Sequence, residues 1–113
     1  MIVDALNLFF MLVFAHLLAD FPLQGDFLAK AKNPYTAIEG VPWKTALAAH
    51  AAIHAEFVWF LTGSWELGAV EFFAHAGIDD MKSRKVFGFN VDQSLHLACK
   101  ALYIILIISM GEL

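Results

Sequence analysis

Four long apolar stretches occupy most of this 113-residue chain. They cover residues 3–21, 44–62, 64–81 and 91–110, and each is close to the roughly 20 residues that a helix needs to cross a bilayer core. Of all residues, 60% are hydrophobic and only 16% are charged, against about a quarter in soluble domains. The sequence therefore predicts a single all-α domain over residues 1–113. We expect an antiparallel four-helix bundle integral to a membrane rather than a compact soluble helical protein.

The basic residues fall into two of the three connections. Six of the seven lie between the first and second stretches or between the third and fourth: Lys30, Lys32, Lys44, Lys82, Arg84 and Lys85. Lys and Arg accumulate on the cytoplasmic side of membrane helices, and both connections share a side only if all four stretches cross. We therefore predict a multi-pass protein with both termini on the outer side. No Lys or Arg precedes the apolar run at residues 5–19, whereas Asp4 does. This flank favours a retained helix over a cleaved signal sequence.

The connections differ in length and character. The longest runs from Pro22 to Pro42 and contains FLAKAK, residues 27–32, in which apolar residues adjoin lysines. This pattern predicts a short interfacial segment at the headgroup level, with its lysines in water. The connection Thr62-Gly63-Ser64 instead predicts a tight hairpin in which Ser64 caps the following helix.

Every histidine has a histidine or aspartate partner four residues away. The pairs, one to each predicted helix, are His16/Asp20, His50/His54, His75/Asp79 and Asp92/His96. Residues four apart in a helix project from the same face. The first and third pairs end their helices and the other two begin theirs, so an antiparallel bundle places all eight side chains at one level near the cytoplasmic face. Ionisable groups inside a membrane bundle normally face its interior and mark a functional site.

The eight side chains suit one or two divalent metal ions, which could be zinc, manganese or iron, because helical bundles build two-metal centres from carboxylates and imidazoles. Three carboxylates are also candidate catalytic groups, as bridging ligands or general bases: Asp20, Asp79 and Asp92. Three more polar residues adjoin the cluster and are expected to support the ligands: Gln24, Glu71 and Gln93. Glu71 is equally well explained as the counter-ion of Lys100. Taken singly, each pair is more simply an interhelical hydrogen bond.

Three segments, AHLLADFPLQGDFLAKAK, HAGIDDMK and DQSLHLACK, resemble the small bacterial and phage membrane proteins of domain-of-unknown-function family 3307. The resemblance covers essentially the whole chain and includes nine motif residues: His16, Asp20, Gln24, His50, His75, Asp79, Asp92, Gln93 and His96. It implies a location in the bacterial inner membrane and supports the fold and the site, but it implies no reaction. A looser similarity links the chain to inner-membrane proteins described as metal-dependent hydrolases.

These patterns favour a membrane-embedded, metal-dependent hydrolase that acts at the cytoplasmic face on an ester or phosphoester of a lipid or lipid-linked molecule. A metal or proton carrier is the rival, although the outer halves LNLFFMLVF and YIILIISM are almost without polar residues, which argues against a pore. A structural or partner-binding protein, held together by its polar ring, is the third reading. The expected partner is the lipid bilayer, assembly into homo-oligomers stays open, and no nucleic-acid partner is expected.

Overall fold

Helices are the only regular elements in residues 2–113, the part of the chain that this computed structural model describes. They are α1 (Ile2–Asp20), α2 (Gly25–Ala31), α3 (Trp43–Thr62), α4 (Trp65–Ser83) and α5 (Phe89–Ser109). The four long helices lie within two residues of the apolar stretches, and α2 overlaps the FLAKAK segment. The all-α class is confirmed.

The helix boundaries follow from residues that end or start a helix. α1 ends at Asp20, shortly before Pro22, whose ring and missing N–H prevent a helix from continuing. At the opposite end of the bundle, Gly63 terminates α3 in the left-handed conformation (φ 72°), which glycine adopts without steric cost. The Ser64 hydroxyl then accepts a hydrogen bond of 3.2 Å from the Leu67 N–H. The predicted hairpin and its cap are confirmed.

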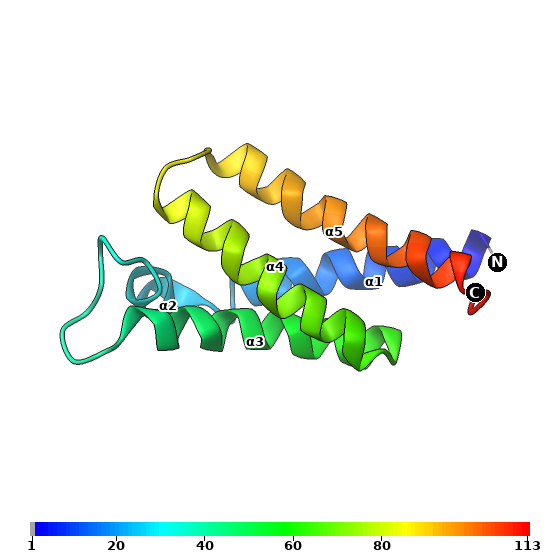
Figure 1. Cartoon of the computed structure of the whole chain (residues 1–113), viewed down its shortest axis with the longest axis horizontal. Coiled ribbons are helices and arrows are strands. Elements are labelled where there is room, and N and C mark those ends of the chain that lie inside the picture. The colour runs from blue at the N-terminus through cyan, green and yellow to red at the C-terminus, as the bar shows by residue number, and fades with distance from the viewer. Residues whose placement is uncertain (1) are drawn as a thin grey trace.

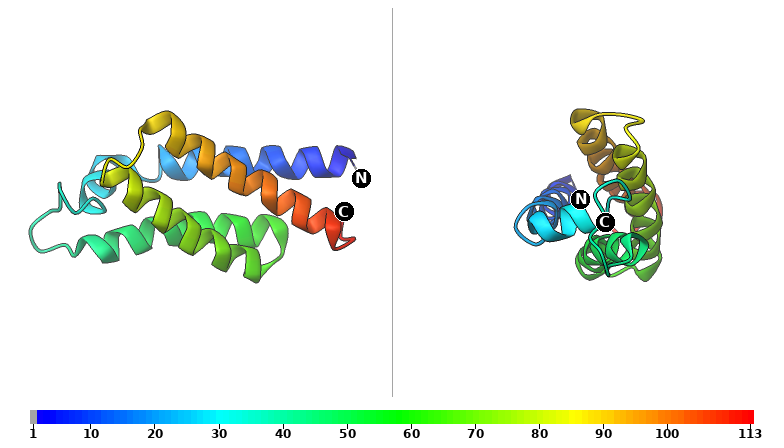
Figure 2. Two further views of the ribbon diagram at one scale, coloured as in Figure 1. Left: turned by 45° about the horizontal axis from the view of Figure 1, so that its top comes forward. Right: turned by 90° about the vertical axis from the view of Figure 1, so that its left-hand side faces the viewer.

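The four long helices form an antiparallel bundle in which helices consecutive in the chain are neighbours (Figure 1). α1 also packs against α5, which closes the ring. Within residues 2–113, no Cα atom of α1 comes within 8 Å of one in α4, nor of α3 within 8 Å of one in α5, so these pairs lie diagonally opposite, as the end view in Figure 2 shows, and only long side chains meet between them. The two termini lie at one end of the bundle, whereas α2 and the α4–α5 connection lie at the other.

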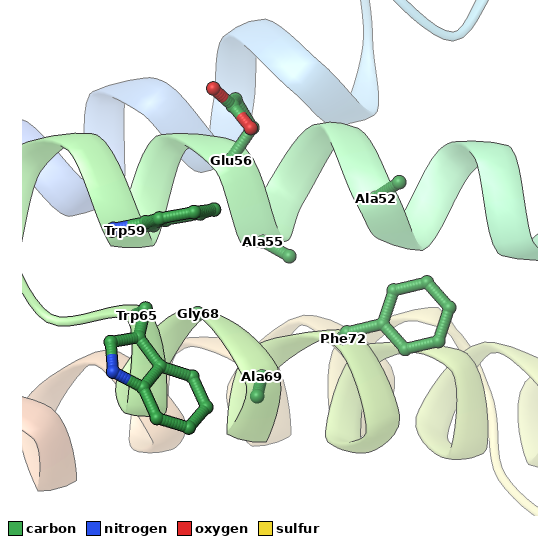
Figure 3. A pocket seen from close by; sticks show the side chains of 8 residues that line it. All are labelled: Ala52, Ala55, Glu56, Trp59, Trp65, Gly68, Ala69 and Phe72. Atoms are coloured by element: carbon green, nitrogen blue, oxygen red, sulfur yellow. The ribbon is translucent and has the colours of Figure 1, made fainter.

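α3 and α4 share the most extensive helix–helix interface. Small residues line the groove between them, among them Ala55, Gly68 and Ala69 (Figure 3). A Cβ atom on Gly68 would lie 2.9 Å from the Cβ of Trp59 and 3.1 Å from the carbonyl oxygen of Ala55. The absence of a side chain at Gly68 is therefore what permits this close approach. The tight hairpin and the glycine together fix α4 against α3.

The largest apolar cluster in the interior of the bundle lies at the end that holds the termini. The core there consists of Ala5, Leu12, Val58, Leu67, Tyr103, Ile104 and Ile107. Towards the other end, ionisable side chains fill the interior. The outer surface carries large apolar side chains, and Phe10, Phe14, Phe60, Phe73 and Ile105 are each at least half exposed. This distribution is the reverse of that in a soluble domain.

By length and hydropathy, one helix of the described part of the chain, α5, is able to cross a membrane. α1 and α2 pass the same test only as a pair, with a bend of 84° between them. α3 and α4 do not pass, and α4 carries Glu66, Glu71, Asp79 and Asp80 along its length. The four helices of the predicted bundle are thus present, but their crossing of a membrane is not confirmed.

Candidate metal centre

The ionisable side chains predicted to share one level meet inside the bundle. All four long helices contribute two each: His16 and Asp20 from α1, His50 and His54 from α3, His75 and Asp79 from α4, and Asp92 and His96 from α5. The histidines are almost fully buried, and even the most accessible of the eight, Asp20, exposes only 11% of its side chain. The cluster lies where α1 and α4 end, on the side of the bundle that holds α2 (Figure 1).

All five histidines turn the same ring nitrogen, Nε2, towards the centre of the cluster. The rings pack face to face or at an angle, and the centroids of His54 and His75 are 3.6 Å apart. This orientation leaves the buried Nδ1 atoms of His16 and His50 without a hydrogen-bond partner. An unpaired buried polar atom costs free energy. The contacts that Nε2 makes inside the cluster must therefore offset the cost of leaving these two Nδ1 atoms unpaired.

The first potential ligand group joins α1, α3 and α4. It consists of Asp20, His50, His54 and His75, each of which offers one atom within 4.8 Å of the others. The Nε2 atoms of His54 and His50 lie 2.9 and 3.2 Å from Oδ1 of Asp20. Three imidazoles and one carboxylate match the ligand number and type of a tetrahedral zinc site. This group could hold one metal ion.

His50 shows why a cation fits this place better than hydrogen bonds alone. Its Nε2 atom lies 3.2 Å from Nε2 of His75, and it is 3.2 and 3.3 Å from carboxylate oxygens of Asp20 and Asp79. One N–H has a single hydrogen and cannot serve three acceptors well in three directions. A metal ion at the centre would attract all of these nitrogen and oxygen atoms at once.

A second group joins α4 and α5. Nε2 of His96 lies 3.2 Å from Oδ1 of Asp79 and 3.4 Å from Oδ1 of Asp92. The Asp92 oxygen is buried and makes no hydrogen bond, which is unusual for a carboxylate away from water. A third group of His16, His75 and His96 overlaps both others. The arrangement could accommodate a second ion beside the first.

Glu71 orients His75 from the next layer of the bundle. Its Oε1 atom accepts a hydrogen bond of 3.2 Å from Nδ1–H of His75 and also pairs with Lys100, while Oε2 accepts one of 2.6 Å from the hydroxyl of Tyr103. A histidine that donates through Nδ1 presents the lone pair of Nε2. Glu71 is therefore the counter-ion of Lys100 and a support of His75 at once, and both readings of this residue hold.

The two glutamines occupy different places. Gln93 lies among the ligands, where its amide nitrogen donates to Asp20 and Asp92 at 3.0 and 3.1 Å and its oxygen lies 3.0 Å from Nε2 of His16. Gln93 therefore lies between the carboxylates of Asp20 on α1 and Asp92 on α5 and donates a hydrogen bond to each. Gln24 precedes α2 and lines a cavity next to Asp79, with its buried Oε1 atom unpaired, so it is beside the cluster and not within it.

Lys32 is a member of the cluster that sequence patterns do not identify. The FLAKAK segment predicts this lysine in water, yet only 14% of its side chain is exposed and its Nζ atom lies 2.6 Å from Oδ2 of Asp79. The contact spans 47 residues of sequence and depends on how the connection after α2 folds back. No helical spacing encodes such a contact.

Comparison with known proteins places the chain in a family. Residues 8–112 match the family described as "Protein of unknown function (DUF3307)". The chain belongs to the DUF3307 family. No curated protein and no solved structure matches it. The family match confirms the resemblance seen in the sequence.

In this DUF3307 member, the buried imidazole and carboxylate groups could hold a metal ion through nitrogen and oxygen ligands. Imidazole and carboxylate ligands suit zinc, iron and manganese. Structural zinc sites usually contain cysteine thiolates, and none of these ligand groups contains a cysteine. The carboxylates outnumber what one tetrahedral ion needs, which leaves an oxygen such as Oδ1 of Asp92 available to accept a proton. The geometry therefore suits chemistry as well as metal binding.

Proposed function

We propose that this protein is a multi-pass protein of the bacterial inner membrane that binds one or two divalent metal ions and hydrolyses an ester or phosphoester of a lipid or lipid-linked molecule at the cytoplasmic face. The observation that carries the proposal is the convergence of five histidines and three aspartates, buried, with every Nε2 turned to one centre. A divalent ion in such a site lowers the pKa of bound water and polarises the oxygen of an ester.

Membrane insertion is supported by the distribution of polarity. The bundle buries nine polar or charged side chains and exposes large apolar ones on every long helix, for example Phe14, Phe60, Phe73 and Ile105. Exposed apolar area on this scale needs a cover, and lipid provides one around the whole circumference. The clustering of basic residues at the end that holds α2 supports a cytoplasmic position for that end.

The aspartates divide into two roles in this proposal. Asp20 and Asp79 are each approached by two or more imidazoles, and Asp79 also by Lys32, so they would serve as metal ligands together with those imidazoles. Asp92 has one oxygen held by Gln93 and the other without a hydrogen bond. That oxygen lies 3.4 Å from Nε2 of His96, and because no hydrogen bond holds it, Asp92 is the best placed general base for water. Gln93 and Glu71 hold the ligands in position.

The apolar core argues against the carrier reading. Beyond Glu71 and Lys100 the interior contains Leu12, Val58 and Ile107, which leave no polar path to the end that holds the termini. An ion or proton that crossed the membrane would have to pass this layer without a ligand. A site that is open to one face only is expected of a hydrolase acting on that face.

Elemental analysis of the detergent-purified protein tests the proposal together with Asp92→Asn. We expect one to two equivalents of zinc, manganese or iron per chain. Asp92→Asn keeps shape and hydrogen-bonding capacity but loses charge, so metal affinity or hydrolysis of bis-para-nitrophenyl phosphate should fall tenfold or more, a typical effect of losing a ligand or its support. The melting temperature should stay close to that of the parent protein.

Glu56→Gln is the matched control, because Glu56 is exposed on α3 (Figure 3) and belongs to none of the potential ligand groups. It should leave metal content and hydrolysis unchanged. A protein that folds and remains active without metal contradicts the metal-dependent reading. If Asp92→Asn lowers only stability, with metal content and turnover intact, the polar ring is structural.

A further inference from the structure

A cleft with basic walls adjoins the metal centre. A cavity of about 220 Å³ lies between the connection after α2 and the end of α4, and its polar lining includes Lys32, Asn33, Asp79, Lys82, Ser83 and Lys85. A second cavity of about 460 Å³ shares Asn33, Ser83 and Lys85 with it. We call the two together the basic cleft. It connects the outside of the bundle to Asp79, a member of the metal centre.

The basic cleft carries an excess of positive charge. Its one carboxylate, Asp79, is already matched by Lys32 at 2.6 Å and by His96 at 3.2 Å. Lys82 and Lys85 take part in no ion pair among the described residues. The Nζ atom of Lys82 lies 5.3 Å from the centre of the Phe89 ring, a cation–π contact that does not neutralise its charge. Two ammonium groups without a carboxylate partner therefore remain for a ligand, and they match the one to two negative charges of a phosphate group.

Arg84 does not compete for the same ligand. Its Nε–H donates a hydrogen bond of 2.9 Å to Asp80, and this bond raises the pKa of the Arg84 guanidinium above its usual value. The charge of Arg84 is thus already paired within α4 and its cap. Lys82 and Lys85, by contrast, have no carboxylate partner among the described residues.

The backbone holds the two free lysines at the cleft. Lys85 has a φ of 62°, a left-handed conformation that residues other than glycine and asparagine rarely adopt. Its N–H donates to the carbonyl oxygen of Lys82 at 2.9 Å, which closes the turn after α4 and keeps both lysines on the lining. The N–H of Val86 also donates to the carbonyl oxygen of Met81 at 3.0 Å, so Lys85 is the left-handed residue of a common helix-ending turn.

We infer that the basic cleft binds the phosphate group of the substrate, so that the substrate is a phosphoester and not an acyl ester. This inference rests on the proposed function, which leaves that choice open. Lys82 and Lys85 donate charge-assisted hydrogen bonds to the phosphate oxygens, as ammonium groups do in many phosphate sites. Asp79 lies at the inner end of the cleft, so a phosphate held there is next to the metal ligands. Membrane topology and the helix dipole also favour lysines at this end of α4, but neither predicts affinity for phosphate.

Phosphate binding to metal-free protein separates the two proposals. The full chain, purified in dodecyl maltoside and treated with chelator, is titrated with inorganic phosphate by isothermal calorimetry. Lys82→Ala and Lys85→Ala should each weaken binding about tenfold, the loss expected for one charge-assisted hydrogen bond. Lys30→Ala and Lys44→Ala are the controls, since both lysines are exposed at the same end of the bundle but outside the cleft. They should change the affinity less than twofold, and all four variants should keep the helical circular dichroism of the parent protein.

Equal effects of all four substitutions, or no phosphate binding at all, overturn the inference. Metal content is measured on the same preparations before the chelator is added. A protein that is purified without metal but binds phosphate refutes the proposed function while retaining the cleft. Glycerol 3-phosphate and dihexanoyl phosphatidic acid distinguish the sources of the phosphate. Tighter binding of the short-chain lipid assigns the cleft to a lipid headgroup, and equal binding assigns it to a soluble phosphoester.

Discussion

At the scale of single residues, Glu71 and Lys100 form the most deeply buried ion pair of the described chain. Each exposes 2% or less of its side chain, and the hydroxyl of Tyr103 donates a hydrogen bond to the second oxygen of the Glu71 carboxylate. A buried pair of this kind adds little net stability, because desolvation offsets the attraction between the charges. Its value here is positional, since Glu71 also fixes the ring of His75.

Glu71→Gln should lower the free energy of unfolding by about 3–5 kcal/mol, because it leaves the charge of Lys100 buried without a partner. The double variant Glu71→Gln with Lys100→Met should recover most of that loss, since both charges are then absent. Chemical denaturation in detergent measures both values. Equal loss in the single and the double variant would show that the pairing of the two charges is not what stabilises this layer.

At the scale of elements, the helices and the shared level of the histidines could be predicted, because both follow from periodicity. Four-residue spacing places His16 with Asp20 and His75 with Asp79 on one helix face whatever the rest of the fold does. The contact of Lys32 with Asp79 could not be predicted, since it depends on the path of an irregular connection. The hydrogen bonds of Gln93 likewise depend on how α5 is rotated against α1.

The α3–α4 interface depends on Gly68. Gly68→Ala should destabilise the protein by about 1–3 kcal/mol, the usual cost of overpacking, because the new Cβ atom would come within 2.9 Å of Cβ of Trp59. Gly77→Ala is the matched control on the same helix, as nothing lies within 4 Å of its Cβ position. That substitution should be neutral or stabilising by up to about 1 kcal/mol, in line with helix propensity. Thermal unfolding of both variants in detergent measures the difference, and equal melting temperatures would contradict the close-approach reading.

At the scale of the whole molecule, length and polarity agree with a bilayer. A 20-residue helix such as α3 is about 30 Å long at roughly 1.5 Å per residue, close to the thickness of a hydrocarbon core. The molecule measures 48 Å along its longest axis, and α2 with its connection extends the bundle at one end. The weak hydropathy of α3 and α4 follows partly from the buried His50, His54, Glu71, His75 and Asp79 and partly from charged residues that are exposed, among them Glu56 and Glu66.

Cysteine labelling tests the resulting topology. With Cys99 replaced by alanine, Arg84→Cys and Glu66→Cys place single thiols at exposed positions at opposite ends of α4. Ser64 is left unchanged because it caps that helix. In the proposed topology the basic end faces the cytoplasm. A membrane-impermeant maleimide should then label the protein at position 66 in intact cells and the protein at position 84 only in inverted membrane vesicles. Positions 66 and 84 lie at the two ends of α4, which can place them on opposite sides only by crossing the bilayer. Labelling of both from the same side would therefore rule out four crossings and would mean that α3 and α4 lie at the membrane surface or in solvent.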